Sequence, residues 1–481
     1  MTAIEIPLLN FAALLPLFIV IGTGLLVVIL DLFVADKKSL GWLSLIGVIL
    51  AAVVSSMQQG IAGFDPTFQN VAISDGYANF YNLIFMSTAA LSILVAMGYL
   101  GRVGLQKGEY YALLLFATSG MMAMAMATDL MVVFIGLETM SIALYIMSAL
   151  NRHSRPSGEA GIKYFLMGAF ASSFLLYGMA LTYGATGSTN FNEIAGVLSA
   201  GTVAPMAMLG LGLMLVGFAF KVAAVPFQWW TPDVYHGAPT AVTTFMSVGA
   251  KAAGFATLMR LLMVSFPAST ADWQLIIAIL AVLTMTLGNV AALAQKDVKR
   301  MLAYSSIAHA GYLLVGVAAG TTEGVSSVLF YLLVYAFMNI GAFAVVGVLE
   351  QKNAVGTKLA EYAGLATRNP WLAAVMAVFL FSLTGFPPLA GFWGKFYLFR
   401  AAVNADLTWL AVVAVINSGI AAFYYLGVVV QMYMKPAEDG APESSVQPAT
   451  QIALAVAGIA VVLIGLIPAP VVDMVTKSLF G

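Results

Sequence analysis

The sequence predicts an all-α integral membrane protein with about fourteen transmembrane helices, and three observations predict this class. Of the 481 residues, 62% are hydrophobic and 9% are charged, and the mean hydropathy is +0.97; soluble domains carry about 25% charged residues. Many apolar runs are long enough to cross the hydrocarbon layer, about 30 Å thick, which takes about 20 helical residues. The connections between these runs alternate between many and few basic residues.

The apolar runs cover the chain from end to end and indicate a single polytopic membrane domain, residues 1–481. Two runs are short, and the run that ends at residue 127 almost meets the next one at Asp129. The fourteen expected spans are residues 8–30, 40–57, 78–99, 111–127, 129–150, 160–184, 205–231, 240–265, 273–293, 300–319, 326–349, 372–403, 408–433 and 449–470.

The basic residues predict the orientation of these spans. The segment 1–10 contains Glu5 and no Lys or Arg, unlike a cleaved signal peptide, so we expect the first span to be retained. Even-numbered connections hold two basic residues, Arg260 and Arg400, both at span ends. Odd-numbered connections hold thirteen: Lys37, Lys38, Arg102, Lys107, Arg152, Arg155, Lys296, Lys299, Arg300, Lys352, Lys358, Arg368 and Lys435. The positive-inside rule therefore places the odd connections in the cytoplasm and both termini outside.

Two of the expected spans contain helix breakers. Span 205–231 contains Pro226, and span 372–403 contains the run Gly385–Gly391 with two glycines and two prolines. Proline removes a backbone donor and clashes with the preceding turn, and irregular backbone at membrane depth survives only inside protein or beside water. Broken helices in matching places of two halves indicate an inverted repeat built around an ion path.

A weaker similarity supports the same repeat. Gly249–Phe255 in one span aligns with Ser418–Phe423 in another, which places Ile420 where Lys251 stands. We therefore expect two inverted five-helix repeats, spans 4–8 and 9–13. The predicted divisions are residues 1–110 for the first three spans, 111–265 for the first repeat, 273–433 for the second and 449–470 for the last span.

Four charged residues fall inside the expected spans: Glu138, Lys221, Lys251 and Lys395. A charge in hydrocarbon costs at least about 2.5–3.5 kcal/mol, so such residues usually mark an ion or proton path. Lys251 lies eleven residues into its span, which is about 16 Å at 1.5 Å per residue and close to the middle. The alternative for Lys251 is a structural ion pair without a transport role.

The surroundings of the other charged residues are less defined by the sequence. Glu138 lies deep in its span, and the simplest partner for it is Lys221 on a neighbouring helix, one turn before Pro226. The alternative for Lys221 and for Lys395 is snorkelling of the ammonium group to the interface. Lys163 lies one turn inside its span, where its position favours an interfacial anchor.

His309 lies near the middle of span 300–319. Imidazole titrates near neutral pH and suits a proton relay; the alternative is a histidine packed in a polar helix contact. If Lys221, Lys251 and Lys395 form a row, they can pass a proton along the membrane, with Glu138 favouring the charged form of its lysine partner.

Several kinds of chemistry are excluded or unsupported. The chain contains no cysteine, which excludes disulfides, iron–sulfur clusters and thiolate metal sites. Its three scattered histidines do not form a metal motif, and no Gly-rich phosphate loop or dinucleotide fingerprint is present. The sequence predicts no cofactor and no metal in this chain.

Three motifs carry a resemblance to a known family: Thr231–Pro239, Gln295–Tyr312 and Phe392–Tyr397. With these motifs the chain resembles the antiporter-like membrane subunits of bacterial NADH:quinone oxidoreductase, respiratory complex I, and in particular its N subunits. The likeness covers nearly the whole chain. It implies fourteen spans, two inverted repeats and two broken helices.

The resemblance also implies roles for residues and partners. Glu138, Lys221, Lys251 and Lys395 match the family's proton-transferring positions, and Lys163 and His309 match secondary ones. The implied function is proton translocation by a non-redox subunit in the bacterial cytoplasmic membrane, with both termini periplasmic. The implied partners are other membrane and peripheral subunits, which hold FMN and iron–sulfur clusters, with quinone bound elsewhere in the complex; no nucleic acid is implied.

Three other functions share parts of this pattern. A subunit of an Mrp-type cation/proton antiporter, or of a related membrane-bound hydrogenase or ferredoxin-linked oxidoreductase, would have the same fold and many of the same ionisable residues. The motifs Thr231–Pro239 and Gln295–Tyr312 favour the N subunits. The buried charges disfavour a purely structural scaffold.

Overall fold

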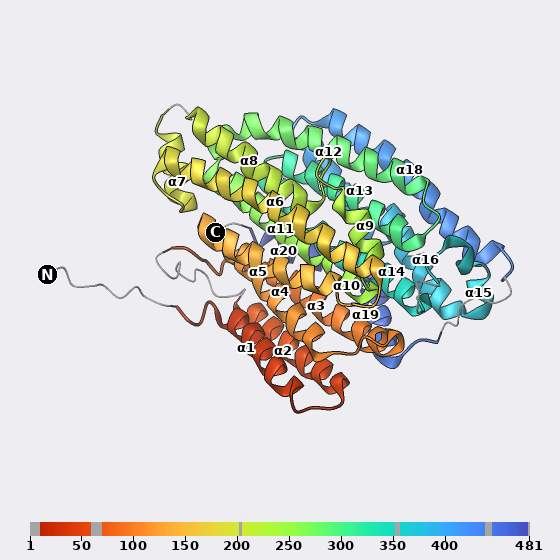
Figure 1. Ribbon diagram of the computed structural model, residues 1–481. Helices are drawn as coiled ribbons and strands as arrows, with labels where there is room; N and C mark the ends of the chain where they lie inside the picture. Colours follow the sequence, from red (N-terminus) through yellow and green to blue (C-terminus); the bar gives the residue numbers. More distant parts are fainter. Residues whose placement is uncertain (1–9, 59–69, 202–203, 352–355, 438–444, 480–481) are drawn as a thin grey trace.

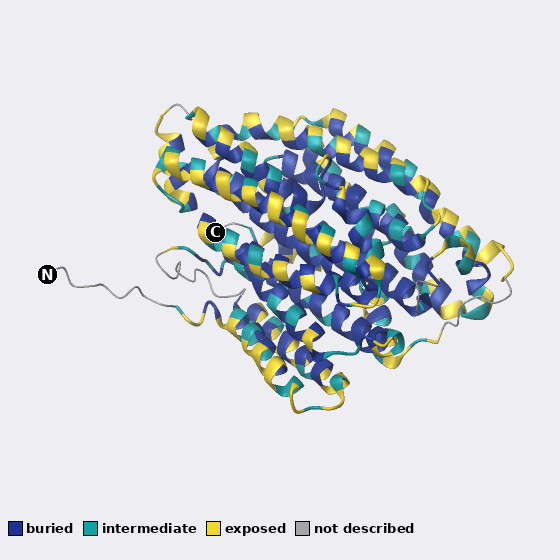
Figure 2. Cartoon of the chain, in the orientation of Figure 1, coloured by how far each residue is buried: buried dark blue, intermediate teal, exposed yellow. Residues whose placement is uncertain are grey.

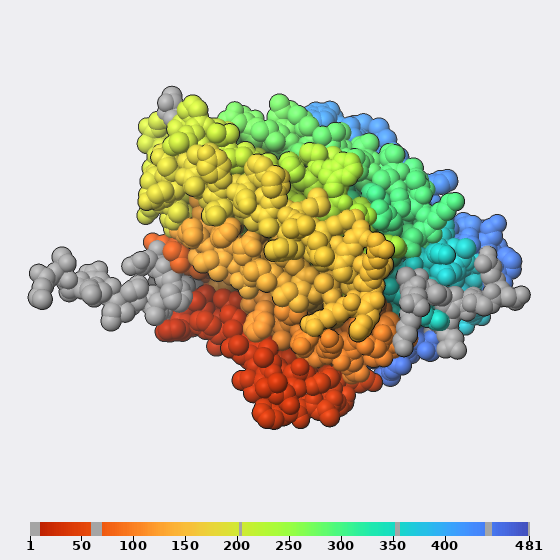
Figure 3. All heavy atoms as spheres, viewed as in Figure 1, coloured from red at the N-terminus to blue at the C-terminus, as the bar shows by residue number. Residues whose placement is uncertain are grey.

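The computed structural model describes residues 10–58, 70–201, 204–351, 356–437 and 445–479, and in these ranges the chain is a bundle of helices (Figure 1). No strand occurs in these ranges beyond isolated β-bridges, which confirms the all-α prediction. In Figure 3 the first two helices, in red, project from the lower edge of the bundle.

The helices in the first part of the chain are α1 (Leu15–Asp31), α2 (Lys37–Gln58), α3 (Gly76–Val103), α4 (Gly108–Met126), α5 (Leu130–Ser148), α6 (Arg155–Thr186), α7 (Phe191–Ser199), α8 (Pro205–Val222), α9 (Trp230–Gly237), α10 (Thr240–Met246), α11 (Gly249–Arg260), the π-helix η1 (Leu261–Ser265) and the 3₁₀-helix η2 (Pro267–Ser269). The remaining helices are α12 (Thr270–Leu293), α13 (Val298–Ala318), α14 (Thr322–Leu349), the 3₁₀-helix η4 (Leu359–Tyr362), α15 (Leu365–Arg368), α16 (Pro370–Thr384), α17 (Ala390–Asn404), α18 (Thr408–Met434), α19 (Pro448–Leu466) and α20 (Ala469–Thr476).

Eleven helical segments in the described ranges are long and apolar enough to cross a membrane. Each of the fourteen expected spans coincides with a helix, but α1, α4 and the broken pair α16–α17 are not among those eleven. The count of fourteen therefore stays a prediction. Exposed residues on the outer helices are largely apolar, for example Ile135, Ile142 and Phe170, and Figure 2 shows buried residues lining the inner faces. This is the surface that lipid or another membrane subunit would cover.

Contacts between connections divide the bundle into two ends. Residues of even-numbered connections meet at one end, where Arg260 bonds to Asp75 and the carbonyl oxygen of Ala12 accepts a hydrogen bond from Gln58. Residues of odd-numbered connections meet at the other end, where His236 lies 3.4 Å from Asp297. This division agrees with alternating spans. Residues 1–9, 480–481 and Lys352 lie outside the described residues, so they add nothing to it.

The two predicted helix breaks are confirmed. Helix α8 ends at Val222, and Ala223 follows with φ 62°; helix α16 ends at Thr384, and Gly385 follows with φ 91°. A positive φ is easily adopted by glycine but is uncommon for alanine, so the first break holds a non-glycine residue in the left-handed region. The first helix of span 205–231 thus ends at Val222, and helical structure resumes only at Trp230.

A third interruption was not predicted. In the span predicted over 240–265, α10 ends at Met246 and α11 begins at Gly249, and the segment closes with the π-helical turn η1. No proline marks this interruption, and Gly249 is the only helix breaker beside it. The interruption places Lys251 in the first turn of α11.

Two matching clasps join connections at opposite ends of the bundle. Asp129 caps α5 and accepts a hydrogen bond from Thr189 Oγ1 at 2.6 Å; Asp297 caps α13 and accepts one from Thr357 Oγ1, also at 2.6 Å. The backbones pair in the same way at each clasp. Thr189 follows Asp129 by 60 residues, and Thr357 follows Asp297 by 60. An inverted repeat requires such equivalent contacts on opposite sides.

The second clasp lies outside the spans, and its carboxylate, Asp297, is stabilised by several hydrogen bonds. Burial alone would raise the pKa of the Asp297 carboxyl, but hydrogen bonds from His236, Thr357 and the Arg300 amide hold that pKa below its usual value. The ionised form is therefore the one that the clasp stabilises.

Glycines allow the closest helix contacts. A Cβ on Gly120 of α4 would lie 2.6 Å from the carbonyl oxygen of Gly136 on α5. On α12 and α13, a Cβ on Gly288 would lie 2.6 Å from the Ala308 nitrogen, and one on Gly311 would lie 2.4 Å from the Met285 nitrogen. Small residues at helix contacts let backbones approach closely in membrane proteins, and this packing holds α5 and α13, which carry Ser141 and Ser306.

Candidate proton-transfer site

Lys251 lies in the centre of a buried polar cluster. Its side chain is buried, with 1% exposure for the residue. Nζ donates to Ser306 Oγ on α13 at 2.6 Å and to the Ser306 carbonyl oxygen, and Tyr335 OH on α14 donates to the same Ser306 Oγ at 2.9 Å. No carboxylate forms an ion pair with Lys251 among the described residues. The structural ion-pair alternative therefore has no support in these contacts.

His309 lies one turn beyond Ser306 on α13, between Lys251 and Lys395. Its Nδ1 is 2.5 Å from Tyr331 OH and its Nε2 is 3.0 Å from Tyr425 OH. Its ring centroid is 5.2 Å from that of Tyr335 and 5.6 Å from that of Tyr312. The imidazole thus has hydroxyl partners on both nitrogens, a geometry in which it can accept a proton on one side and donate from the other.

Lys395 completes this cluster. It lies on α17 just after the second break, with the residue 4% exposed. Nζ donates to the Thr384 carbonyl oxygen at 2.9 Å and lies 4.6 Å from the ring centroid of Tyr312. Thr384 is the last residue of α16, so the break itself supplies the acceptor. Lys395 is buried and does not snorkel to the interface.

Lys221 and Glu138 form a second cluster, and the direct pair expected from the sequence is wrong. Lys221, 2% exposed, donates to Ser141 Oγ at 2.6 Å and approaches Tyr145 OH at 3.4 Å. Glu138 is half-buried and accepts from Ser172 Oγ at 2.5 Å. Ser141 lies one helical turn after Glu138 on α5, so the ammonium reaches the hydroxyl of that turn rather than the carboxylate.

The ends of the helices act differently on the two lysines. Lys221 lies in the last turn of α8, where the carbonyl groups at the helix end favour a positive charge. Lys251 lies in the first turn of α11, where the N–H groups at the helix start disfavour a positive charge. Hydrogen bonds from Lys251 to two oxygens of Ser306 offset this opposition. The two sites therefore differ in how firmly they hold a proton.

Lys163 belongs to a third, more exposed cluster. Its side chain is 40% exposed and lies 2.7 Å from Glu159 and 3.0 Å from Asp233, and Asp233 also pairs with Arg300 at 2.9 Å. Burial would raise the pKa of the Asp233 carboxyl, but Lys163 and Arg300 hold it below its usual value. Lys163 is thus tied to carboxylates at the edge of the bundle.

The position of Asp233 corresponds to that of Lys395. Asp233 follows Ala223, at the first break, by ten residues, and Lys395 follows Gly385, at the second break, by ten. Pro226 and Pro388 likewise each follow those residues by three. The two broken helices match in register, but one carries an acid where the other carries the buried lysine.

Sequence reasoning missed the hydroxyl partners of the lysines. Ser141, Ser306, Tyr331 and Tyr335 are ordinary residues in apolar helices, and nothing in their spacing marks them. Among the described residues, no three His, Asp or Glu side chains gather as metal ligands.

These features define a class: a multi-pass membrane protein with two broken helices and buried lysines that donate to hydroxyl and backbone carbonyl oxygens. Comparisons with known proteins identify the family. The profile described as NADH:quinone oxidoreductase/Mrp antiporter, TM, matches residues 127–421. The chain is 48% identical to NADH-quinone oxidoreductase subunit N of Trichlorobacter lovleyi over 98% of this chain and 97% of that one. It belongs to this family of NADH:quinone oxidoreductase and antiporter membrane subunits.

Solved structures agree with this assignment. A chain of respiratory complex I from Thermus thermophilus with bound aureothin is 34% identical, covers 95% of this chain and 98% of its own length, and gives a TM-score of 0.81. A chain of the Mrp complex from Dietzia is 21% identical with a TM-score of 0.83, over 98% of this chain and 97% of its own length. The second likeness shows a shared fold.

Proposed function

We propose that the chain is the N-type, proton-translocating membrane subunit of an NADH:quinone oxidoreductase in the bacterial cytoplasmic membrane. The observation that carries this proposal is the cluster of Lys251, His309 and Lys395, which are buried together among Ser and Tyr side chains. Relatives named as N subunits, 48% and 44% identical over nearly the whole chain, support it. The partners are the other membrane and peripheral subunits of that assembly.

The chain itself supplies no redox centre. It has no cysteine to hold an iron–sulfur cluster, so FMN, iron–sulfur clusters and quinone would be bound by partner subunits. Its part in the enzyme is that of a non-redox translocase subunit, which receives energy as a conformational or electrostatic change.

The geometry suggests how the residues would work. Lys221 and Glu138 form the first proton-binding site of the row. Lys251 and Lys395 form the second and third sites, and Lys163 is a secondary residue at the edge of the bundle. A proton that leaves Lys251 would pass first along the hydrogen bonds of Ser306 and Tyr335 and then along those of His309 with Tyr425 and Tyr331, with water bridging the gaps on the way to Lys395. Separation of like charges along this row would drive release from Lys395.

We also propose that residues 111–265 and 273–433 are inverted repeats, with 1–110 and 449–470 as flanking spans. The two clasps and the equal register of the two breaks support this division. In this arrangement the odd-numbered connections lie in the cytoplasm and both termini lie in the periplasm, as the basic residues indicate.

Single cysteines test this orientation, because the natural chain has none. We expect Arg152→Cys to be modified by a membrane-impermeant maleimide only in inside-out vesicles, and Asn192→Cys only in right-side-out vesicles. Both positions are exposed. Mass spectrometry of this subunit reads the modification; the opposite pattern would invert the proposed topology.

A second candidate function is cation/proton antiport, because the fold is shared with an Mrp complex chain. The two functions differ in sodium dependence. We expect vesicles containing the assembly to acidify on addition of NADH in sodium-free buffer, at the same rate as with sodium. Acidification that requires sodium, or that occurs without NADH on a sodium gradient, would favour the antiporter and overturn the proposal.

A further inference from the structure

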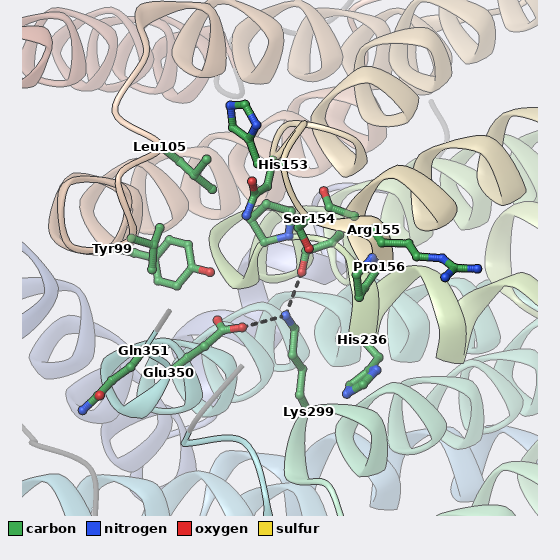
Figure 4. Close-up of a pocket in the computed structure, with 16 residues that line it drawn as sticks. Tyr99, Leu105, His153, Ser154, Arg155, Pro156, His236, Lys299, Glu350 and Gln351 are labelled. Carbon is green, nitrogen blue, oxygen red and sulfur yellow. Dashed lines mark hydrogen bonds and ion pairs between the residues drawn. The ribbon is translucent and has the colours of Figure 1, made fainter. Parts of the chain in front are cut away.

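A pocket opens at the end of the bundle where the odd-numbered connections meet. It has a volume of ≈ 520 Å³ and is lined by residues from the ends of α3 and α9, from the starts of α6 and α13, and from the connections that precede α6 and follow α14. Figure 4 shows Lys299 reaching into its centre, toward Glu350 and a backbone carbonyl oxygen. Lys221, Lys251, Lys395, Glu138 and His309 do not line this pocket, so the pocket lies apart from the row of lysines.

The floor of the pocket is a buried ion pair. Lys299 Nζ lies 3.3 Å from Glu350 Oε1 and donates to the Ala238 carbonyl oxygen at 2.7 Å. The two side chains are 2% and 9% exposed. A buried ion pair often contributes little to stability, because desolvation opposes the attraction. Its position at the floor of a polar pocket indicates a role other than stability.

A stripe of hydroxyl groups leads from the pocket to Lys251. Pro239 lines the pocket, and Thr240 and Thr244 follow on one face of α10, with Ser247 as the C-cap of that helix and Lys251 four residues further on in α11. All three hydroxyl residues are buried. Eleven residues separate Thr240 from Lys251, about 16 Å along a helix. The stripe therefore spans the distance from the pocket to the middle of the bundle.

Helix α14 faces this stripe and continues it. Asn339 Nδ2 donates to Ser247 Oγ at 2.8 Å, and Tyr335, one turn away, donates to the Ser306 hydroxyl that also holds Lys251. At the outer end, the Thr240 amide donates to the hydroxyl of Tyr99, which lines the pocket together with Glu350. The stripe is thus connected to the pocket at one end and to Lys251 at the other.

Two polar atoms along the stripe have no hydrogen-bond partner among the described residues. They are Thr240 Oγ1 and Asn339 Oδ1, both buried. Buried polar atoms are nearly always satisfied by protein or by ordered water. These two atoms provide anchoring points for water at both ends of the stripe.

We propose that the pocket is the entrance through which protons reach Lys251. The Lys299–Glu350 pair controls entry into the pocket. The hydroxyl groups of Thr240, Thr244 and Ser247, together with Asn339, carry the protons from there to Lys251. This rests on the proposed function and its orientation, which place the pocket on the cytoplasmic side. The Glu350 carboxylate binds a proton and becomes neutral, while Lys299 stays held by Ala238. The proton then passes along hydroxyls and water to the neutral amine of Lys251, and Glu350 pairs again with Lys299.

The test uses the intact assembly in inside-out vesicles. We expect Glu350→Gln, and separately Thr244→Val with Ser247→Ala, to slow NADH-driven acidification at least tenfold. Lost proton-transfer groups cost about 10²–10⁴-fold, and water that enters the stripe can replace part of that loss. The control is Thr257→Val, which removes a buried hydroxyl beyond Lys251 on the same helix and should leave the rate unchanged.

A cysteine keeps the test independent of folding. Ser247→Cys is measured before and after treatment with a small thiol reagent in the same vesicles, so assembly is identical in both measurements. We expect modification to block acidification, with a cytoplasmic-side reagent acting fastest. Full acidification in the modified cysteine variant and in Glu350→Gln, with Lys251→Met inactive, would overturn the entrance but keep the proposed function. Full acidification in Lys251→Met as well would overturn the proposed function itself.

Discussion

Replacing Lys251 with methionine should abolish NADH-driven proton translocation while the assembly stays intact. Methionine keeps much of the length of the side chain and removes the buried charge, so packing on α13 and α14 survives. It leaves Ser306 without the ammonium group that links it to the row toward His309 and Lys395. Proton-transfer groups contribute about 10²–10⁴-fold to rates. The rates of vesicle acidification and of NADH oxidation, recorded together, should both fall by at least about 10²-fold.

A matched lysine provides the control for this variant. Lys435→Met changes an exposed lysine at the end of α18 and should leave both rates as they are. Equal amounts of the subunit in purified assemblies show that the loss at Lys251 is not a loss of folding. Normal acidification in an assembled Lys251→Met variant would mean that the buried lysine is structural.

Replacing Gly311 with alanine should sharply lower the amount of folded subunit. The new Cβ would lie 2.4 Å from the backbone nitrogen of Met285 and 2.8 Å from its Cα. These atoms cannot rotate away, so α12 and α13 must separate. Overpacking costs about 1–3 kcal/mol or more, and α13 also carries Ser306 and His309. Quantitative detection of the subunit in membranes, together with the melting temperature of the purified assembly, measures the effect.

Gly419→Ala is the matched control for this packing prediction. Gly419 lies on α18 and is exposed, and no atom of another element lies within 4 Å of the point that a Cβ would occupy there. Alanine there should raise helix propensity slightly and leave the amount of subunit unchanged. Equal accumulation of both variants would contradict the close contact between α12 and α13.

The fold and the charged members of the site could be predicted because their signals are local. A run of about 20 apolar residues predicts a spanning helix. A proline, or several glycines and prolines close together, predicts where that helix is interrupted. A lysine such as Lys251, far from either end of its span, cannot reach water, so its burial follows from position alone. The two breaks and the depth of Lys251 are where these rules applied without competition, whereas for Lys395 the sequence left snorkelling open.

The partners of the charges could not be predicted, because they depend on helix rotation and crossing. Depth alone makes Glu138 the natural partner for Lys221, but α5 presents Ser141 to the ammonium instead. Ser306 is the main partner of Lys251 only through the close packing of α11, α13 and α14. Likewise, the interruption before Gly249 has no proline, and tertiary packing decides it.

One signal was present in the sequence and was missed. Asp129 with Thr189 and Asp297 with Thr357 have the same spacing, and each aspartate precedes a helix as an N-cap. Pairing these four residues gives the register of the repeat more sharply than the similarity around Lys251. The spacing of the two breaks, Ala223 and Gly385, separately places Asp233 in the position of Lys395, a difference that would make the two halves unequal in charge.

The most direct test of the central claim, that buried lysines of this subunit carry the proton, is infrared difference spectroscopy of the intact assembly. Lysines labelled with ¹⁵N identify ammonium bands that appear or disappear when NADH is added. We predict labelled bands in the natural assembly that are lost in Lys251→Met and in Lys395→Met and retained in Lys435→Met. Identical labelled bands in all four proteins, or no labelled bands during turnover, would contradict the claim.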